Sequence, residues 1–577
     1  MTASNIKNFD TVNFKATSSH IAAGDTLLTL NGGATSLDWK KLHVDNLDSL
    51  NASATSDTIL TLMRHTANNI NLANYSTTGT RGRIHSADYE ADIMTDGNSA
   101  TTQNIYLKGY RFRNNTASYA GGTATDAWGG RSQIGNKVEN NKLTLTGGSA
   151  TLVARGGLVS NTERDAHGNL KTTGDAEKNS LILNAGANTL NAYGAEVRTK
   201  SGSAADNTAT LNAGTVNGSL YGASLSAAGA TGSATKNKVE IKGGSVTGSV
   251  YGSHIADGAA TGSATASTVT VTGGTVSGDI YGGFTNGSGK TTGNIVNLGN
   301  GTSIGAISVA GTIHGGNKAD ASGNTLDVKT NAQAGNIKNF ETIKLTLKSG
   351  SFNPANSLLR LTGGAQTTNL DWSKLEVDTT TLAATPKSYE AYRVKLMENA
   401  NGISFMKGAT NTYASHGAKE RTQGNLEYVI DTDNHTANAA NSIDLEAYQF
   451  QNKQNAAFTA ADGTKAEAWG GRTKVGNKVQ NNKLTVSGGT LTQAAYGGLA
   501  ENFKRDDHGN LKTTGDAEKN SLILNAGANT LNAYGAEVRT KSGSAAANTA
   551  TLNAGIVNGN LYGASLSAAG ATGSAMK

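Results

Sequence analysis

Several features common in globular proteins are missing from this 577-residue chain. It has no cysteine, which excludes disulfide bonds and thiolate metal sites. It has only 2 prolines, and it contains no run of about 20 apolar residues that would predict a membrane-spanning helix. Aromatic residues make up 5 % of the chain and charged residues 16 %. The composition therefore provides neither one large mixed core nor a heavily charged surface.

The charge pattern and the first residues argue against two further classes. The net charge is +6 at pH 7, and the lysines and arginines are scattered rather than clustered, so the sequence predicts no nucleic-acid partner. The opening residues, MTASNIKNFD, contain neither the basic nor the apolar region of a signal peptide. The chain is therefore compatible with an excerpt of a longer precursor.

Glycine is abundant instead, with 73 residues. Disordered glycine-rich linkers lack apolar periodicity, whereas here leucine and β-branched residues recur between the glycines. We therefore interpret the glycines as turns between many short strands.

Two nested repeats organise the chain. NIKNFDTVNF from Asn5 returns as NIKNFETIKL from Asn336, 331 residues later. The segment HGNLKTTGDAEKNSLILNAGANTLNAYGAEVRTKSGSAA from His167 recurs unchanged from His508, 341 residues later. The increase in offset indicates about ten residues of insertion in loops. A long repeat of roughly 335 residues is thus present almost twice.

A short repeat of 28 to 30 residues lies inside the long one, and two residue types mark it. A Tyr-Gly pair marks one column, formed by Tyr193, Tyr221, Tyr251, Tyr281, Tyr496, Tyr534 and Tyr562. Asparagine marks the second column, formed by Asn104, Asn141, Asn179, Asn207, Asn237, Asn294, Asn324, Asn441, Asn482, Asn520 and Asn548, with Ser267 in one place. Two independent markers in one frame make a chance coincidence improbable.

Each short repeat contains the parts of two or three strands. Asparagine is followed by an alternating strand such as KVEI, then by Gly-Gly and a second strand such as SVTGSVYG. One such repeat buries too little apolar surface to offset the entropy of ordering about 30 residues, but stacked copies pair their strands and cover each other. The sequence therefore predicts an all-β parallel β-helix. Equivalent residues then lie about 4.8 Å apart, so the asparagines and tyrosines form structural ladders that fix the register.

Four segments follow from these periods. Residues 1–100 and 333–435 depart from the short repeat and carry longer apolar runs, so we interpret them as irregular joining segments with protruding hairpins. Residues 101–332 and 436–577 hold the regular repeats, and the second set is incomplete.

The two periods together resemble the passenger regions of bacterial type V autotransporters. The motifs that carry the resemblance are NKVEIKGGSVTGSVYG, STVTVTGGTVSGDIYGG and the joining stretch GNIKNFETIKLTL with SLLRLTGGAQTTNLDWSKLEVD. The resemblance covers nearly the whole chain and implies a right-handed β-helix displayed on the bacterial outer membrane, in adhesion, aggregation or biofilm roles. The chain departs from the family pattern because it contains neither a signal peptide nor a C-terminal membrane barrel.

One polar insertion offers a candidate surface site. It contains Arg164, Asp165 and His167 in the first copy and Arg505, Asp506 and His508 in the second. Asp and His can exchange protons and Arg can hold a carboxylate, but a His-Gly-Asn turn with solubilising charges explains the same residues. We favour the solubilising loop.

Other site chemistries have less support in the sequence. β-Helical polysaccharide-cleaving enzymes collect acidic residues on one strand face, and acidic residues seldom recur in frame here, so we assign no catalytic residue. The tyrosine column could bind glycans by ring stacking, although a packing ladder is the favoured interpretation. No metal-binding spacing occurs, and we predict neither a metal nor a cofactor.

We therefore expect a non-enzymatic, extracellular stalk or adhesin on the bacterial surface. Its partners would be host or bacterial surface glycans or proteins, with no nucleic acid. The alternative is a filament subunit that self-associates by stacking open β-helix ends. A polysaccharide-active enzyme is the least favoured hypothesis.

Overall fold

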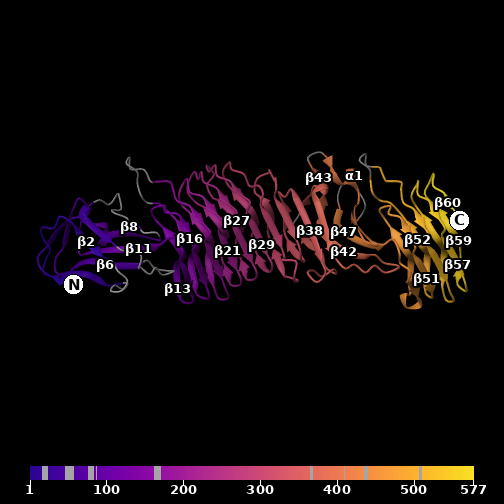
Figure 1. Ribbon diagram of the computed structural model, residues 1–577, viewed down its shortest axis with the longest axis horizontal. Coiled ribbons are helices and arrows are strands. Elements are labelled where there is room, and N and C mark those ends of the chain that lie inside the picture. Colours follow the sequence, from indigo (N-terminus) through magenta and orange to yellow (C-terminus); the bar gives the residue numbers. More distant parts are fainter. Residues whose placement is uncertain are drawn as a thin grey trace. The chain divides into compact units, whose positions relative to one another are not determined.

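A computed structural model of the chain describes residues 1–15, 24–45, 58–75, 84–85, 88–161, 171–363, 368–407, 410–433, 440–505 and 510–576. The described residues are almost entirely strand and loop (Figure 1). Their only helices are the short α1 (Thr412–His416) and the single-turn η1 (Trp39–Lys41), η2 (Asp96–Asn98), η3 (Trp372–Lys374) and η4 (Ala460–Asp462). The prediction of an all-β chain is confirmed.

Contacts divide the chain into two compact units. Unit 1 comprises residues 1–298, 306–326 and 337–341, and unit 2 comprises residues 299–305, 327–336 and 342–577. Each unit contains one joining segment and a set of regular repeats.

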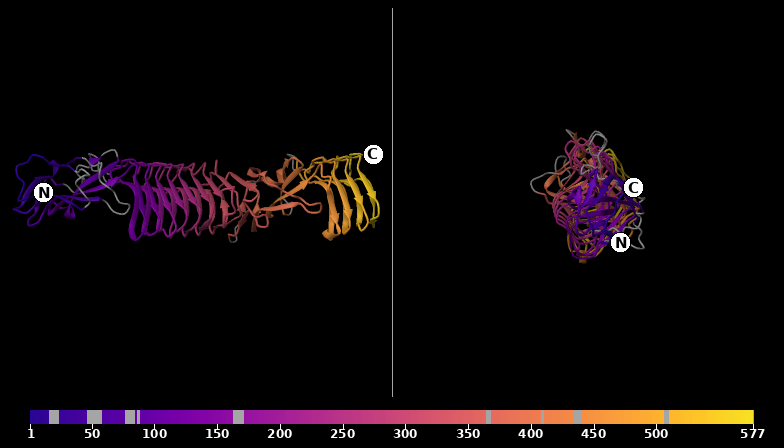
Figure 2. Two further views of the ribbon diagram at one scale, coloured as in Figure 1. Left: turned by 60° about the horizontal axis from the view of Figure 1, so that its bottom comes forward. Right: turned by 90° about the vertical axis from the view of Figure 1, so that its left-hand side faces the viewer.

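The regular repeats of unit 1 place their strands in three rows, and each strand pairs in parallel with its equivalent one repeat along (Figure 2, left). The first row contains β12 (Thr116–Tyr119), β15 (Lys142–Leu145), β18 (Ser180–Leu183), β21 (Thr208–Leu211), β25 (Lys238–Ile241), β29 (Thr268–Val271) and β32 (Ile295–Leu298). The second contains β13 (Thr123–Ser132), β16 (Ser149–Val159), β19 (Asn188–Val197), β23 (Leu220–Leu225), β27 (Val250–Ile255), β31 (Ile280–Thr285) and β34 (Thr312–Gly316). The third contains β14 (Val138–Glu139), β17 (Ala176–Glu177), β20 (Ala204–Ala205), β24 (Ala234–Thr235) and β28 (Ala264–Thr265).

Short additional strands precede the second row in the later repeats. They are β22 (Thr215–Val216), β26 (Ser245–Val246), β30 (Gly274–Val276) and β33 (Ile307–Val309). All of them also pair in parallel from one repeat to the next. The third strand that the sequence suggested corresponds to the third row, whose two-residue strands lie just before Asn141, Asn179, Asn207, Asn237 and Ser267.

A thin core runs through each repeat because alternate strand residues point inward. Val239 and Ile241 of β25 are fully buried, while Lys238 of the same strand is exposed. The buried side chains of one repeat lie on those of the next, so no repeat has to bury its apolar surface alone. Hydrophobic burial of this kind contributes about 1.5–3 kcal/mol per large aliphatic side chain.

Two backbone features form the corners between rows. Gly244 and Gly274 have φ of +81° and +92°, a region that glycine enters without steric cost. The residue before the column asparagine is also left-handed even when it is not glycine, with φ of +53° to +56° at Lys178, Asp206 and Lys236. Left-handed backbone at such residues costs about 1–2 kcal/mol each, so the asparagine contacts that follow must hold the turn.

The joining segment of unit 1 adds antiparallel strands to parallel ones. The sheet order is β1 (Thr2–Ala3), β3 (Thr26–Leu30), β6 (Thr58–His65), β11 (Asn104–Arg111), β9 (Tyr89–Thr95) and β8 (Ile84–His85). The first two pairings are parallel, and β6–β11, β11–β9 and β9–β8 are antiparallel. Within the described part of this segment, β9 is buried along most of its length.

Unit 2 repeats both parts of this plan. Its joining segment contains β39 (Leu359–Leu361), β42 (Tyr392–Ser404), β45 (Lys419–Gln423), β46 (Leu426–Thr432) and β47 (Ala440–Gln449), where β39–β42 is parallel and β42–β47, β46–β47 and β45–β46 are antiparallel. The first row of its repeats contains β48 (Ala456–Thr459), β51 (Lys483–Ser487), β54 (Ser521–Leu524) and β57 (Thr549–Leu552). The second row contains β49 (Thr464–Thr473), β52 (Thr490–Ala500), β55 (Asn529–Val538) and β59 (Leu561–Leu566). The third row contains β50 (Val479–Gln480), β53 (Ala517–Glu518), β56 (Ala545–Ala546) and β60 (Ala575–Met576). The short β58 (Ile556–Val557) pairs with β55.

Candidate functional site

The tyrosine column is a continuous stack of rings on the second row of strands. In unit 1 the ring centroids of Tyr193 and Tyr221 are 4.5 Å apart, those of Tyr221 and Tyr251 5.0 Å, and those of Tyr251 and Tyr281 5.3 Å. The rings are parallel to within 7°. In unit 2 the same arrangement joins Tyr496 to Tyr534 at 5.2 Å and Tyr534 to Tyr562 at 5.3 Å.

In unit 1 the stack is half-buried, and the faces of its rings are covered by neighbouring side chains. His314 continues the stack beyond Tyr281 at 4.5 Å, and the guanidinium of Arg155 lies 5.9 Å from the centre of the Tyr193 ring at the other end. Burial raises the pKa of Tyr193, Tyr221 and Tyr251, so their hydroxyls stay neutral. A sugar ring that stacks on an aromatic side chain needs an uncovered face. The geometry of the column therefore favours packing over glycan stacking.

A second ring column lies beside the first in unit 1. His254 and Phe284 stand on neighbouring strands at equivalent positions, with centroids 5.3 Å apart. Phe284 meets Tyr281 edge-on at 5.0 Å. Burial lowers the pKa of His254 to about 4, so this imidazole is neutral at physiological pH.

The asparagine column is a buried chain of amides. Nδ2 of Asn179 donates to Oδ1 of Asn207 at 3.0 Å, and the backbone N–H of Asn179 donates to the same oxygen at 3.0 Å. The same pair of contacts joins the other members, which are Asn141 to Asn179, Asn207 to Asn237, Asn294 to Asn324, Asn482 to Asn520 and Asn520 to Asn548. The side-chain oxygen of each of these asparagines thus accepts the backbone N–H that directly follows the left-handed residue of the preceding repeat.

The break at Ser267 is repaired locally. Serine is too short to accept from Nδ2 of Asn237, and Ser253 accepts that bond at 2.9 Å instead. Ser253 also shares a hydrogen bond of 2.6 Å with Ser267. Alanine occupies the Ser253 position in the two preceding repeats, at Ala195 and Ala223. The serine pair therefore replaces one amide link of the ladder.

The structure excludes Asn104 and Asn441 from the column. Asn104 lies in β11, where both its backbone N–H and its Nδ2 donate to Asp96, and Asn441 lies in β47 beside Asp433. Both strands pair antiparallel, so neither residue has an equivalent one repeat along. The first members of the column are instead Asn115, which donates its backbone N–H to Asn141, and Lys453, which donates its own to Asn482.

Two further ladders had no recognised sequence signal. Oγ of Ser203 accepts from the backbone N–H of Ser233, and Ser233 accepts in the same way from Ser263. On the second row, Ser219 accepts from the backbone of Ser249, and Ser249 accepts from Asp279. Recurrence of serine at a spacing of 30 would have found both, but serine is common in this chain and the pattern is inconspicuous.

Most of the polar insertion lies outside the described residues. This holds for Arg164, Asp165, His167, Asp506 and His508. Arg505 is described, and its backbone forms an antiparallel bridge with Leu511. The neighbouring Lys504 bridges to Gly417 and pairs with Glu420 at 2.5 Å. The start of the insertion in unit 2 is therefore fastened to the joining segment.

Each joining segment also supplies one buried glutamate that the sequence did not suggest. Glu90 of β9 accepts from the Ser132 hydroxyl at 2.7 Å, from the Gln133 backbone at 2.5 Å and from the Asn136 amide at 3.1 Å. Glu427 of β46 makes the same three contacts, with Thr473 at 2.6 Å, Lys474 at 2.7 Å and Asn477 at 2.9 Å. Both glutamates thus hold by hydrogen bonds the loop that follows the first long strand of the repeats, which is β13 in unit 1 and β49 in unit 2.

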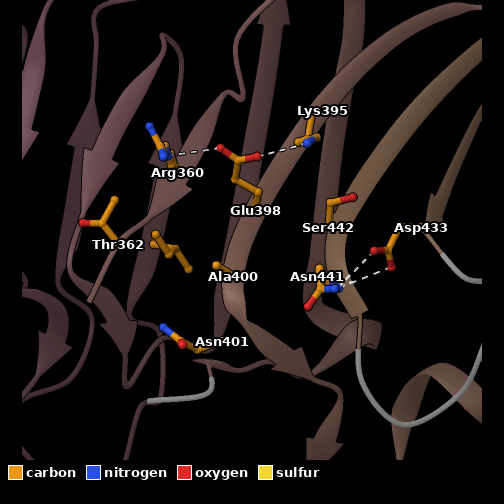
Figure 3. A pocket seen from close by; sticks show the side chains of 10 residues that line it. Arg360, Thr362, Lys395, Glu398, Ala400, Asn401, Asp433, Asn441 and Ser442 are labelled. Carbon is orange, nitrogen blue, oxygen red and sulfur yellow. Dashed lines mark hydrogen bonds and ion pairs between the residues drawn. The ribbon is translucent and has the colours of Figure 1, made fainter. Parts of the chain in front are cut away.

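A polar pocket of about 390 Å³ opens in the joining segment of unit 2 (Figure 3). Three of its residues form one row across three adjacent strands, because Arg360 of β39 stands beside Glu398 of β42, and Glu398 stands beside Ser442 of β47. The other lining residues are Leu361, Thr362, Lys395, Ala400, Asn401, Asp433 and Asn441.

The charges of the pocket lie on two sides. Glu398 pairs with Arg360 at 3.3 Å and with Lys395 at 3.0 Å. Burial opposes ionisation of Glu398, yet its hydrogen bonds with Lys395 and Ser357 and the charges of Lys395 and Arg360 hold its pKa below the usual value. Asp433 lies apart from this group, and both its carboxylate oxygens are 3.3 Å from the backbone nitrogen of Asn441 (Figure 3).

The corresponding row in unit 1 carries different chemistry. Thr29, Arg64 and Asn104 stand side by side where unit 2 has Arg360, Glu398 and Ser442. The fold of the joining segment therefore does not require the pocket charges.

Comparison with known proteins identifies no relative: no family model matches the chain, and neither the curated proteins nor the solved structures contain a match. None of the helices in the described ranges is long and apolar enough to cross a membrane. Within the same ranges, no three His, Asp or Glu side chains are grouped so that they could hold a metal ion.

Proposed function

We propose that the repeats of each unit wind as a right-handed parallel β-helix. Support comes from the three rows of strands, in which equivalent residues of successive repeats are direct partners, as in Tyr221 beside Tyr251 and Val239 beside Val269. Connections between parallel strands of one sheet are right-handed in almost all proteins.

The protein is proposed to be a non-enzymatic, surface-displayed structural protein of the autotransporter passenger type. It acts as a stalk or adhesin in adhesion, aggregation or biofilm formation. The observation that carries this proposal is the use of the recurring side chains: tyrosine, asparagine and serine columns all make contacts from repeat to repeat. Where the recurring side chains hold successive repeats in register and do not form a reactive cluster, added repeats lengthen the structure and extend its surface.

Surface display can be tested on the bacterium that makes the protein. Antibodies raised against the purified chain should label intact cells, and external protease should remove that label while a cytosolic marker survives. Beads coated with the purified chain should then adhere to cells or to each other more than uncoated beads. Antigen that stays protected in intact cells would overturn the proposal.

A further inference from the structure

We propose that the pocket between β39, β42 and β47 binds an acidic saccharide, one or two sugar rings long, with its carboxylate against Arg360 and Lys395 and its hydroxyls against Asp433. The inference rests on the proposed surface role only for the source of the ligand, because the pocket itself is a property of the purified chain.

The Arg360 side of the pocket has unused hydrogen-bond donors. Arginine carries five N–H donors and lysine three, and here both side chains share the single carboxylate of Glu398. The side chains of Arg360 and Lys395 remain 63 % and 47 % exposed, so their other donors face the pocket and solvent. Two cations around one anion leave one positive charge in excess, which favours a ligand carboxylate.

The opposite side offers acceptors. Asp433 is exposed, and among the described residues no lysine or arginine forms an ion pair with it. Its carboxylate can accept two or more further hydrogen bonds, because an ionised carboxylate has about four lone-pair sites. A ligand with hydroxyl donors at this end suits it, whereas a second carboxylate at this end would be repelled.

The space between the two sides fits a polyhydroxylated ring. Thr362 and Ser442 provide hydroxyls and Asn441 an amide, while Ala400 has a side chain too small to fill the centre (Figure 3). A volume of about 390 Å³ lies within the range of roughly 300–1,000 Å³ usual for small-molecule sites. The lining contains no aromatic ring, so recognition depends on hydrogen bonds and charge, and we expect weak binding with Kd on the order of 1 mM.

The test is a calorimetric titration of the purified full chain with the disaccharide of galacturonic acid, with lactose as the neutral comparator. The acidic disaccharide should bind at least about fivefold more tightly than lactose, and Arg360→Ala should remove most of that difference, since it removes a charge-assisted hydrogen bond to the ligand carboxylate. Ala400→Leu should abolish binding of both sugars by filling the pocket, with the charges unchanged.

Arg393→Ala is the matched control. Arg393 lies on the same strand, β42, is 68 % exposed and pairs with Glu446 outside the pocket lining, so its removal changes the net charge equally and should leave the titration unchanged. Circular dichroism of every variant establishes that the fold persists. Equal affinity for the two sugars, no heat at 20-fold excess over the expected Kd, or equal loss in the Arg360 and Arg393 variants would each overturn the proposal. Failure of surface labelling would leave this titration unaffected, so the two proposals fail separately.

Discussion

The first regular repeats of units 1 and 2 are nearly the same sequence, yet their buried charges are arranged in opposite ways. In unit 1 a carboxylate lies between two guanidinium groups: Glu196 accepts from Arg155 at 2.5 Å and from Arg198 at 2.9 Å. In unit 2 a guanidinium lies between two carboxylates: Arg539 pairs with Glu501 at 3.0 Å and with Glu537 at 2.8 Å.

Two charge-changing differences between the copies accompany this inversion. Arg155 in unit 1 stands where Tyr496 stands in unit 2, and Ser160 stands where Glu501 stands. Tyr496 joins the new network through its hydroxyl, which donates to Glu467 at 3.1 Å and accepts from Arg539 at 2.7 Å. The register of the strands is unchanged, since Arg155 and Tyr496 both stand beside a column tyrosine on the next repeat. The scaffold thus fixes positions, and the sign of the central charge can change as long as partners surround it.

The largest expected effect comes from removing the central guanidinium of unit 2. Arg539→Ala should lower the free energy of unfolding of unit 2 by about 2–4 kcal/mol, because it leaves Glu501 and Glu537, both 8 % exposed, with fewer partners. Arg198→Ala, the same change in unit 1, should cost under about 1 kcal/mol because Arg198 is 47 % exposed and Arg155 still neutralises Glu196. Urea denaturation followed by circular dichroism measures both. Equal losses of unfolding free energy in the two variants would show that the inverted charge arrangement does not affect stability.

The asparagine ladder gives the next prediction. Asn207→Ser should destabilise unit 1 by about 2–3 kcal/mol because the Nδ2 of Asn179 loses a buried acceptor. Adding Ala195→Ser should recover at least half of the loss, since Ser253 and Ser267 make that repair naturally. The same serine at Asn548 should cost less, because Asn548 is partly exposed. A double variant no more stable than the single one would contradict the repair.

The buried Glu427 predicts a pH dependence of the free energy of unfolding. Burial raises the pKa of Glu427 to about 7 in spite of its three hydrogen bonds. A raised carboxyl pKa means that the folded state binds the proton more tightly, so the contribution of this group to stability is present at pH 4.5 and is lost as the pH rises toward 7. The loss should be about 2.5 kcal/mol over this window. Unfolding measured at several pH values should show a decline that Glu427→Gln removes; a decline that survives in this variant would assign it to other groups.

The smallest expected effect concerns the ring columns, and it should appear in unit 1 alone. Burial lowers the pKa of His254 to about 4, so unfolding releases an imidazole that binds protons more readily. The contribution of His254 is therefore present above about pH 6.5 and is lost as the pH falls toward 4. His254→Phe copies Phe284 of the next repeat and should flatten the decline by about 2 kcal/mol, somewhat less than full burial would give because His254 is partly exposed. An unchanged acid limb in thermal unfolding would contradict this account.

The regular repeats were largely predictable because their period is visible in the residues themselves. Tyrosine at 28 and 30 residue spacings led directly to rings 4.5–5.3 Å apart, and alternating residues such as those of KVEI led to buried Val239 and Ile241. The same reasoning failed at Asn104 and Asn441. They precede Asn141 and Asn482 by 37 and 41 residues, close to the 38 residues between Asn141 and Asn179, but they lie on antiparallel strands that the period does not describe. A sequence frame cannot distinguish a true repeat from a returning strand of similar length.

The pocket and the buried glutamates were beyond sequence reasoning for a related reason. Arg360, Glu398 and Ser442 are about 40 residues apart from one to the next, and only the pairing of β39, β42 and β47 places them in one row. Glu427 and Thr473 are 46 residues apart and meet only because β46 is buried beside the first long strand of the repeats. No local pattern marks these pairs, since neither depends on the short repeat.

The sequence by itself determined the length of the repeat, the faces of its strands, and the side chains that stack from one repeat to the next. These follow from local propensity and from a period that places like residues at one strand spacing. The tertiary structure alone decided where the columns begin, which glutamates are buried, and which charges meet in the pocket. Those features arise where the period is interrupted and antiparallel strands return across it, so that contacts depend on pairings that no residue spacing specifies.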